Sequence, residues 1–222
     1  MQFKIHKQGW IYLATSLILS IILFPFFLIL SFLFLFISLY IFYFFRDPDR
    51  YIPYEDLIVS PADGIVTHIG EEHFIVNESQ KNTFIKVSIF LDIFNVHVNR
   101  MPCNGIIKNI KYIHGKFINA TLDKSSNDNE RNIITLEKEN NDIIIIKQIA
   151  GLIARRIVCE VKTNQQVYKG HRFGIIKFGS RVDLLLPMNY KPLVTLGQTV
   201  VGGETIIANP NKIEKITKSL KI

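Results

Sequence analysis

Cysteine is scarce in this chain of 222 residues: it occurs twice, as Cys103 and Cys159, at positions far apart. Two such residues give no sign of the disulfide framework that staples small extracellular domains. We expect both thiols to be reduced, buried and inert, as is usual on a cytoplasmic face.

Patterns that hold a metal ion or present a lysine for modification are also missing. The histidines beyond the N-terminal region form no HxH or HExxH pair; they are His68, His73, His97, His114 and His171. A membrane-anchored metallopeptidase, which needs paired ligands at close spacing, is therefore disfavoured. A membrane-tethered carrier or scaffold domain would present a lysine on a hairpin of the Met-Lys-Met kind, and the sequence has none. Both classes stay open as alternatives to the function considered below.

Charge is absent from one long stretch of the chain. The 38 positions from Gln8 to Phe45 contain no Asp, Glu, Lys or Arg. This run is about twice the roughly 18 apolar residues that indicate one membrane span. It is too long for a secretory signal, and it ends in FFRDPDR without a small-residue cleavage site.

Pro25 lies inside this apolar run, and proline breaks or kinks a helix because it lacks a donor and clashes with the preceding turn. Two arrangements are compatible with it. One is a helical hairpin that dips into one leaflet or crosses twice, and the other is a single long tilted helix. We favour the hairpin, because positive charge on both flanks suits two cytoplasmic ends; the flanking residues are Lys4, Lys7, Arg46 and Arg50.

The remainder of the chain is polar and basic, and the whole carries a formal net charge of +7. Nucleic acid is one partner that such a charge could attract. Next to an apolar anchor, an anionic lipid surface is the better interpretation. We therefore expect no nucleic-acid partner.

After residue 46 the sequence consists mostly of short runs rich in Ile and Val, separated by Gly, Pro, Asn and Asp; examples are FIKVSIFL, IIKNIKYI, NIITLEK and RVDLLLP. This pattern predicts a mostly β (α+β) fold with few helices. VYKGHRFGIIKFG and VTLGQTVVGGETIIA share a glycine-turn-strand pattern that is typical of barrel-sandwich domains such as lipoyl and biotinyl carriers. The predicted fold is thus a barrel-sandwich-like β domain preceded by the hydrophobic helical hairpin.

Three short stretches contain residues that could carry chemistry: SPADGIV with Asp63, FNVHVNRMP with His97, and KFGSRVD with Ser180. Each has an ordinary structural interpretation, since Asp-Gly is a common turn and a strand histidine is usually structural. Gly179-Ser180 alone is usually a loop. Together the three supply an acid, an imidazole and a hydroxyl, which are the parts of a nucleophile system.

Several longer motifs, in order, resemble the phosphatidylserine decarboxylase proenzyme family in its short bacterial, pyruvoyl-dependent form. They are FFRDPDR, SPADGIV, FLDIFNVHVNRMP, GKFINATLDKSSNDNERN, QIAGLIARRIVC and GHRFGIIKFGSRVDLLLP, and they extend from about Phe44 to Pro187. The chain departs from the family pattern at Asp92-Ile93, where a serine and often a proline are common. It departs again at His114, where Tyr-x-Pro-Gly is common.

The resemblance implies specific roles for the three candidate residues. Ser180 would become the pyruvoyl group that forms a Schiff base with the substrate, with His97 and Asp63 as further catalytic residues. The chain would cut itself between Gly179 and Ser180 into a large β chain, residues 1–179, and a small α chain, residues 180–222. These would stay associated as a heterodimer. Residues 1–45 would be the membrane anchor and residues 46–222 the decarboxylase domain.

The resemblance also implies a reaction and a location. The reaction is decarboxylation of phosphatidylserine to phosphatidylethanolamine and CO2 in phospholipid biosynthesis. The covalent pyruvoyl group would be the cofactor, with no external cofactor and no metal. The expected location is the cytoplasmic face of the cell membrane, where the lipid substrate is found.

Overall fold

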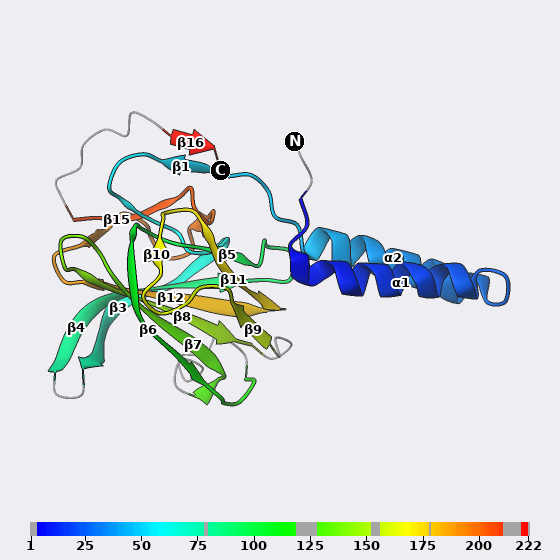
Figure 1. The fold of residues 1–222 in the computed structure, drawn as a ribbon, viewed down its shortest axis with the longest axis horizontal. Helices are drawn as coiled ribbons and strands as arrows, with labels where there is room; N and C mark the ends of the chain where they lie inside the picture. Colours follow the sequence, from blue (N-terminus) through cyan, green and yellow to red (C-terminus); the bar gives the residue numbers. More distant parts are fainter. Residues whose placement is uncertain are drawn as a thin grey trace.

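The structure is a computed structural model, and it describes residues 4–77, 80–118, 128–151, 156–177, 179–210 and 219–221. A β-rich body makes up most of the molecule, and two antiparallel helices project from one side of it (Figure 1). The two helices are α1 (Trp10–Leu23) and α2 (Leu28–Phe44), and α1 is preceded by the short 3-10 helix η1 (Lys7–Gly9). The predicted hairpin is confirmed, and Pro25 lies in the turn between the helices.

The interior of the hairpin is polar and its outer surface is apolar. The Ser20 hydroxyl donates to the Ser31 carbonyl at 2.9 Å, and the Ser31 hydroxyl donates back to the Ser20 carbonyl at 2.8 Å. The Ser38 hydroxyl donates to Ser16 Oγ at 2.9 Å. On the outside, Ile29 is 88% exposed. In the described part of the chain no helix combines the length and apolar character required to cross a membrane.

The strands of the body are named here in chain order. They are β1 (Tyr51–Pro53), β2 (Ile58–Val59), β3 (Gly64–Asn77), β4 (Gln80–Leu91), β5 (Val98–Arg100), β6 (Gly105–Ile113), β7 (Arg131–Glu137), β8 (Ile143–Ala150), β9 (Arg156–Cys159), β10 (Gln166–Val167), β11 (Arg172–Lys177), β12 (Ser180–Pro187), β13 (Lys191–Pro192), β14 (Thr199–Val200), β15 (Ile206–Asn209) and β16 (Ser219–Lys221). The predicted β-rich fold is therefore confirmed.

One large sheet organises these strands, in the order β10-β6-β7-β8-β12-β4-β3-β14. Smaller sheets have the orders β5-β11-β9, β13-β15-β2 and β1-β16. The long strands curl around a common interior in Figure 1, as expected for a barrel-like domain. β12 lies centrally, with antiparallel neighbours β4 and β8.

Burial on both faces explains the apolar composition of β12. Val182, Leu184 and Leu186 belong to the main core, whereas Leu185 packs in a separate cluster on the other face. Since side chains alternate along a strand, Ser180 projects toward the same face as Val182. The serine at the start of β12 is thereby directed into the main interior.

The two cysteines are free, and they differ in exposure. Cys103 is fully buried, and burial raises the pKa of its thiol to about 12, as expected for an inert residue. Cys159 is only half-buried, and its thiol donates to the carbonyl of Val161. The expectation of burial is thus confirmed for Cys103 and wrong for Cys159, which lies on β9 at the edge of a three-stranded sheet where fewer neighbours cover it.

Candidate active site

Ser180, the first residue of β12, is fully buried. Its partners across the sheet are Leu91 on β4 and Ala150 on β8. Within the described residues its hydroxyl has no hydrogen-bond partner. A buried hydroxyl left unpaired costs free energy, so such a group suggests a chemical role.

Gly179 precedes this serine with a φ of +51°, in the left-handed region. A residue with a Cβ is disfavoured there by about 1–2 kcal/mol. A Cβ built at Gly179 would meet no described atom within 4 Å, apart from its chain neighbours. The backbone conformation, rather than crowding, therefore makes glycine the suitable residue before Ser180.

His97 lies just before β5 and is fully buried. Its Nδ1 is 3.0 Å from the carbonyl oxygen of Asn95; because a carbonyl only accepts, Nδ1 carries the proton and donates it. Nε2 is then the unprotonated nitrogen, and it has no hydrogen-bond partner in the described part of the chain. Burial lowers the pKa of His97 to about 4, and the Arg46 cation contributes in the same direction. Near pH 7 the imidazole is therefore neutral, as a general base requires.

Asp63 lies in the connection between β2 and β3, next to a glycine that the packing requires. A Cβ at Gly64 would come within 2.1 Å of the Phe90 carbonyl oxygen on β4. The Asp63 carboxylate accepts hydrogen bonds from Arg50 Nη2 at 2.9 and 2.8 Å and from the Gly202 N–H at 2.8 Å. Burial raises the pKa of Asp63, and Arg50 and the Gly202 N–H oppose this rise.

The structure brings the elements that carry His97 and Ser180 to the same face of the large sheet. On β5, Asn99 accepts a hydrogen bond from Gln148 Nε2 at 2.8 Å. Gln148 is the cross-strand partner of Val182, two residues after Ser180. The strand that follows His97 therefore lies over the face from which Ser180 projects.

No hydrogen bond joins Asp63, His97 and Ser180 to one another in the part of the chain that the structure describes. The carboxylate of Asp63 is occupied by Arg50 and Gly202 instead of His97. The three catalytic roles therefore stay predictions, and Asp63 would act through its neighbours or after a rearrangement that frees it.

Analysis of the sequence missed the charged residues that link the motifs. Buried Asp47 pairs with Arg100, whose Nη2 is 2.8 Å from Asp47 Oδ1, and it also pairs with Arg172. FFRDPDR thus contacts FNVHVNRMP through Asp47 and SPADGIV through Arg50. In the sequence, only the cluster of charged residues in FFRDPDR, directly after an uncharged run, could have indicated these contacts.

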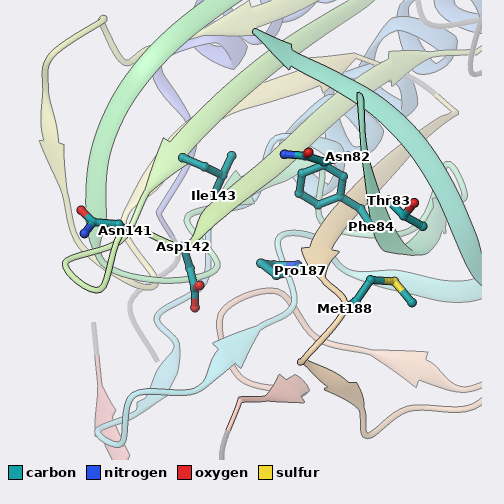
Figure 2. A pocket seen from close by; sticks show the side chains of 8 residues that line it. All are labelled: Asn82, Thr83, Phe84, Asn141, Asp142, Ile143, Pro187 and Met188. Carbon is teal, nitrogen blue, oxygen red and sulfur yellow. The ribbon is translucent and has the colours of Figure 1, made fainter. Parts of the chain in front are cut away.

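A separate pocket of about 530 Å³ lies at the other end of β12 (Figure 2). It is lined by residues from the ends of β4, β8 and β12, among them Phe84, Ile143 and Pro187. Pro187 is seven residues from Ser180, or about 23 Å along a strand. This pocket therefore lies outside the site of Ser180. Among the described residues no three of the types His, Cys, Asp and Glu are grouped so that they could hold a metal ion.

These features define a class: a mostly β protein with a hydrophobic N-terminal hairpin, a neutral buried histidine, and a buried serine that follows a left-handed glycine and is unpaired among the described residues. Comparison with known proteins is more specific. The family model for phosphatidylserine decarboxylase matches residues 37–208, which is more than half of the chain. The chain belongs to the phosphatidylserine decarboxylase family.

Curated relatives named phosphatidylserine decarboxylase proenzyme are similar over nearly the whole length. The protein from Wolbachia sp. subsp. Brugia malayi is 47% identical over 223 aligned positions, covering 98% of this chain and 97% of the relative. The protein from Ehrlichia chaffeensis is 52% identical, covering 92% and 91%. The protein from Rickettsia typhi is 47% identical, covering 93% and 91%.

Proposed function

We propose that this chain cuts itself between Gly179 and Ser180 and then decarboxylates phosphatidylserine to phosphatidylethanolamine and CO2. Membership of the family supports the reaction and the substrate. The observation that carries the proposal in this chain is the Ser180 hydroxyl, buried and unpaired among the described residues directly after left-handed Gly179.

Self-cleavage follows from the chemistry of these two residues. The Ser180 oxygen attacks the Gly179 carbonyl carbon, the peptide C–N bond breaks, and an ester replaces it. His97, whose Nε2 is unprotonated and has no hydrogen-bond partner among the described residues, is the base that we assign to the hydroxyl proton. Loss of the Ser180 α-proton then expels the Gly179 carboxylate and leaves dehydroalanine. Addition of water and departure of ammonia give a pyruvoyl group at the new N-terminus.

The residues around position 180 fit such a group. Its precursor side chain is buried, unpaired in the described part, and directed to the main interior. The pyruvoyl carbonyl supplies an electrophile that binds the substrate amine and accepts the electrons released as CO2 leaves. In that step His97 is the residue we assign to return a proton to the substrate carbon; its bare Nε2 must first take up that proton, because the neutral imidazole holds none there.

The two fragments are expected to remain one particle. β12 belongs to residues 180–222, while its neighbours β4 and β8 belong to residues 1–179. Separating the fragments would break the hydrogen bonds on both sides of β12 and expose its apolar side chains. We therefore propose a heterodimer of the two cleaved chains.

We propose that the hairpin binds the cytoplasmic face of the cell membrane. Its outer surface is apolar, and its serine hydroxyls are satisfied between the helices. At 1.5 Å per residue, the 17 residues of α2 extend about 26 Å, slightly less than the roughly 30 Å of a hydrocarbon core. This length favours a hairpin that dips into one leaflet, with the site of Ser180 near the headgroups.

Intact-mass spectrometry of the purified protein tests the proposal. We expect two fragments, with a cut before residue 180 and 43 residues in the smaller one. Treatment with an amine and a hydride reductant should add mass to the smaller fragment alone, because only that fragment carries a ketone. An active preparation with an unbroken chain would contradict the proposal.

A further inference from the structure

A stack of aromatic rings connects the hairpin to His97. The Phe44 and His97 rings have centroids 4.2 Å apart and planes tilted by 32°. Phe44 meets Phe45 edge to face at 5.1 Å, and Phe45 stacks on Tyr12 at 5.7 Å with an interplanar angle of 12°. Phe44 and Phe45 lie at the end of α2 and Tyr12 near the start of α1, so both helices contribute. We call Tyr12, Phe45 and Phe44 the aromatic bridge.

The other end of the aromatic bridge contacts the segment that leads to the cleavage site. Lys177 Nζ is 3.2 Å from Tyr12 Oη and 5.0 Å from the centroid of the Tyr12 ring. It also lies 3.3 Å from Gln8 Oε1. Lys177 is the last residue of β11, three positions before Ser180, and it is buried.

Two further contacts attach the turn just before His97 to α2 and to Arg46, which follows α2. The Tyr40 hydroxyl donates to the Ile93 carbonyl at 3.2 Å. Arg46 Nη2 donates to the Phe94 carbonyl at 2.6 Å. The turn itself is tied by Asp92, whose carboxylate accepts from the Phe94 N–H at 2.7 Å. The departure of this chain from the family pattern at Asp92 thus has a local structural use.

We propose that the aromatic bridge positions His97 and the segment before Ser180 relative to each other, so that the hairpin is part of the active site. This inference rests on the proposed self-cleavage and deepens it. Phe44 and Phe45 are fully buried, and aromatic side chains have few rotatable bonds, so they make a stiff spacer. The three rings are positioning residues, because they act through His97 and Lys177.

The effect of the bridge on the reaction has two physical sources. One is geometry, since a misplacement of about 1 Å can slow a positioned reaction by about a hundredfold. The other is exclusion of water from His97 by Phe44, which keeps the imidazole neutral. The other groups that influence the pKa of His97 are the Asn95 carbonyl and Asp92, which raise it, and Arg46, which lowers it.

The test follows self-cleavage of the full-length chain, synthesised in a cell-free reaction with phosphatidylserine-containing vesicles. A short labelling pulse gives the first-order rate of conversion of intact chain to fragments between pH 4 and pH 8. Phe44→Leu removes the ring that faces His97, and Phe44→Tyr restores a ring. Phe36→Leu is the matched control, because Phe36 is 73% exposed on α2 and lies outside the bridge.

We expect Phe44→Leu to slow cleavage at pH 7 on the order of tenfold, within the range that misplacement allows. The pH below which its cleavage rate falls should also rise, because the pKa of His97 returns toward its ordinary value. Phe44→Tyr should restore most of the rate, and Phe36→Leu should match the parent chain. Tyr12→Phe, which removes only the hydroxyl that contacts Lys177, should slow cleavage without changing the pH at which the rate falls.

The inference is overturned if Phe44→Leu keeps the parent rate and pH profile, or if Phe36→Leu is affected equally. A second result would also overturn it: Phe44→Leu cleaves slowly with an unchanged pH dependence, and Phe44→Tyr does not restore the rate. Loss of fold would suffice to explain that result. Failure of the proposed function looks different: the parent chain would stay uncut, or Ser180→Ala would still be cut.

Discussion

Ser180 and Ser88 are both buried serines on neighbouring strands, β12 and β4, and each has a hydroxyl with no hydrogen-bond partner among the described residues. Ser88 is the cross-strand partner of Asp183, three residues after Ser180. The two serines thus share a place in the same large sheet, full burial, and a hydroxyl that is unpaired in the described part of the chain. They differ in that only Ser180 follows a left-handed glycine, so Ser88 is an internal control for the chemistry of Ser180.

The first prediction compares these two serines. Ser180→Ala should leave a single intact chain without decarboxylase activity, because no hydroxyl is then available to attack the Gly179 carbonyl. Ser88→Ala should be processed to two fragments like the parent chain. Denaturing gel electrophoresis together with an assay of CO2 release would measure both. An uncut Ser88→Ala chain would show that cleavage responds to any loss of a buried hydroxyl in this sheet.

The second prediction concerns the backbone at Gly179. Gly179→Ala meets no steric obstacle in the described part of the structure, so its effect isolates the left-handed φ of +51°. The penalty of about 1–2 kcal/mol corresponds to cleavage slower by about 5- to 30-fold if that conformation is needed for attack. Gly179→Asn should be slowed less, because asparagine tolerates this region better. Equal rates for all three chains would show that the conformation is not required.

The third prediction concerns pH and His97. The folded chain holds the pKa of His97 at about 4, below the usual 6.5, so the unfolded state binds its proton first as the pH falls. The free energy of unfolding is therefore unaffected by His97 above about pH 6.5. Between pH 6.5 and about 4 it falls by about 3 kcal/mol, because the unfolded state binds a proton that the folded state does not. Urea unfolding of the uncut Ser180→Ala chain at pH 7 and pH 4.5 should show this loss. The additional change His97→Gln should reduce the difference; an unchanged difference would assign it to other groups.

The fourth prediction concerns the buried charges behind the site. Asp47→Asn leaves Arg100 and Arg172 without their shared carboxylate and should lower the free energy of unfolding by about 3–5 kcal/mol. Asp128→Asn, which breaks the exposed pair with Lys116, should cost less than about 1 kcal/mol. Denaturant unfolding in the Ser180→Ala background would measure both. Similar small losses would mean that Asp47 contributes little beyond a surface ion pair.

The fifth prediction concerns lipid binding. Phe36→Asp places a charge in the middle of α2 and should weaken vesicle binding by about 3 kcal/mol, or about a hundredfold. Tyr54→Asp, at an exposed position of the β body, should bind vesicles like the parent chain. Flotation with phosphatidylserine-containing vesicles gives the bound fraction. If the vesicle-bound fraction of Phe36→Asp equals that of Tyr54→Asp, the hairpin is not the lipid-binding element.

Local sequence signals were enough for the hairpin and the β-rich body. The uncharged run from Gln8 to Phe45 gave the length of two short helices, and Pro25 gave the turn between them. Alternation and turn residues likewise predicted strands, because both depend on neighbours in the chain. Cys159 shows the limit, since composition cannot reveal that a residue lies on a strand at the edge of its sheet.

The individual candidates Ser180, His97 and Asp63 came from motifs, but their surroundings did not. Arg50 and Asp63 are brought together by topology, and no local pattern encodes their pairing. Phe44 was hidden among many aromatic residues of the apolar run, which sequence alone interprets as lipid-facing. Its contact with His97 depends on how the hairpin meets the body, which only the three-dimensional structure reveals.

The hydroxyl pairs between α1 and α2 have a consequence for the fate of the two products. These serine hydroxyls are paired within the hairpin, so its transfer from solvent into hydrocarbon breaks none of their hydrogen bonds. Transfer back to solvent would expose a large apolar surface to water, which is unfavourable. Both helices precede Gly179 and so belong to the longer product. If the chain is cut as proposed, the pairing of β12 with β4 and β8 would retain the shorter product at the bilayer together with the longer one.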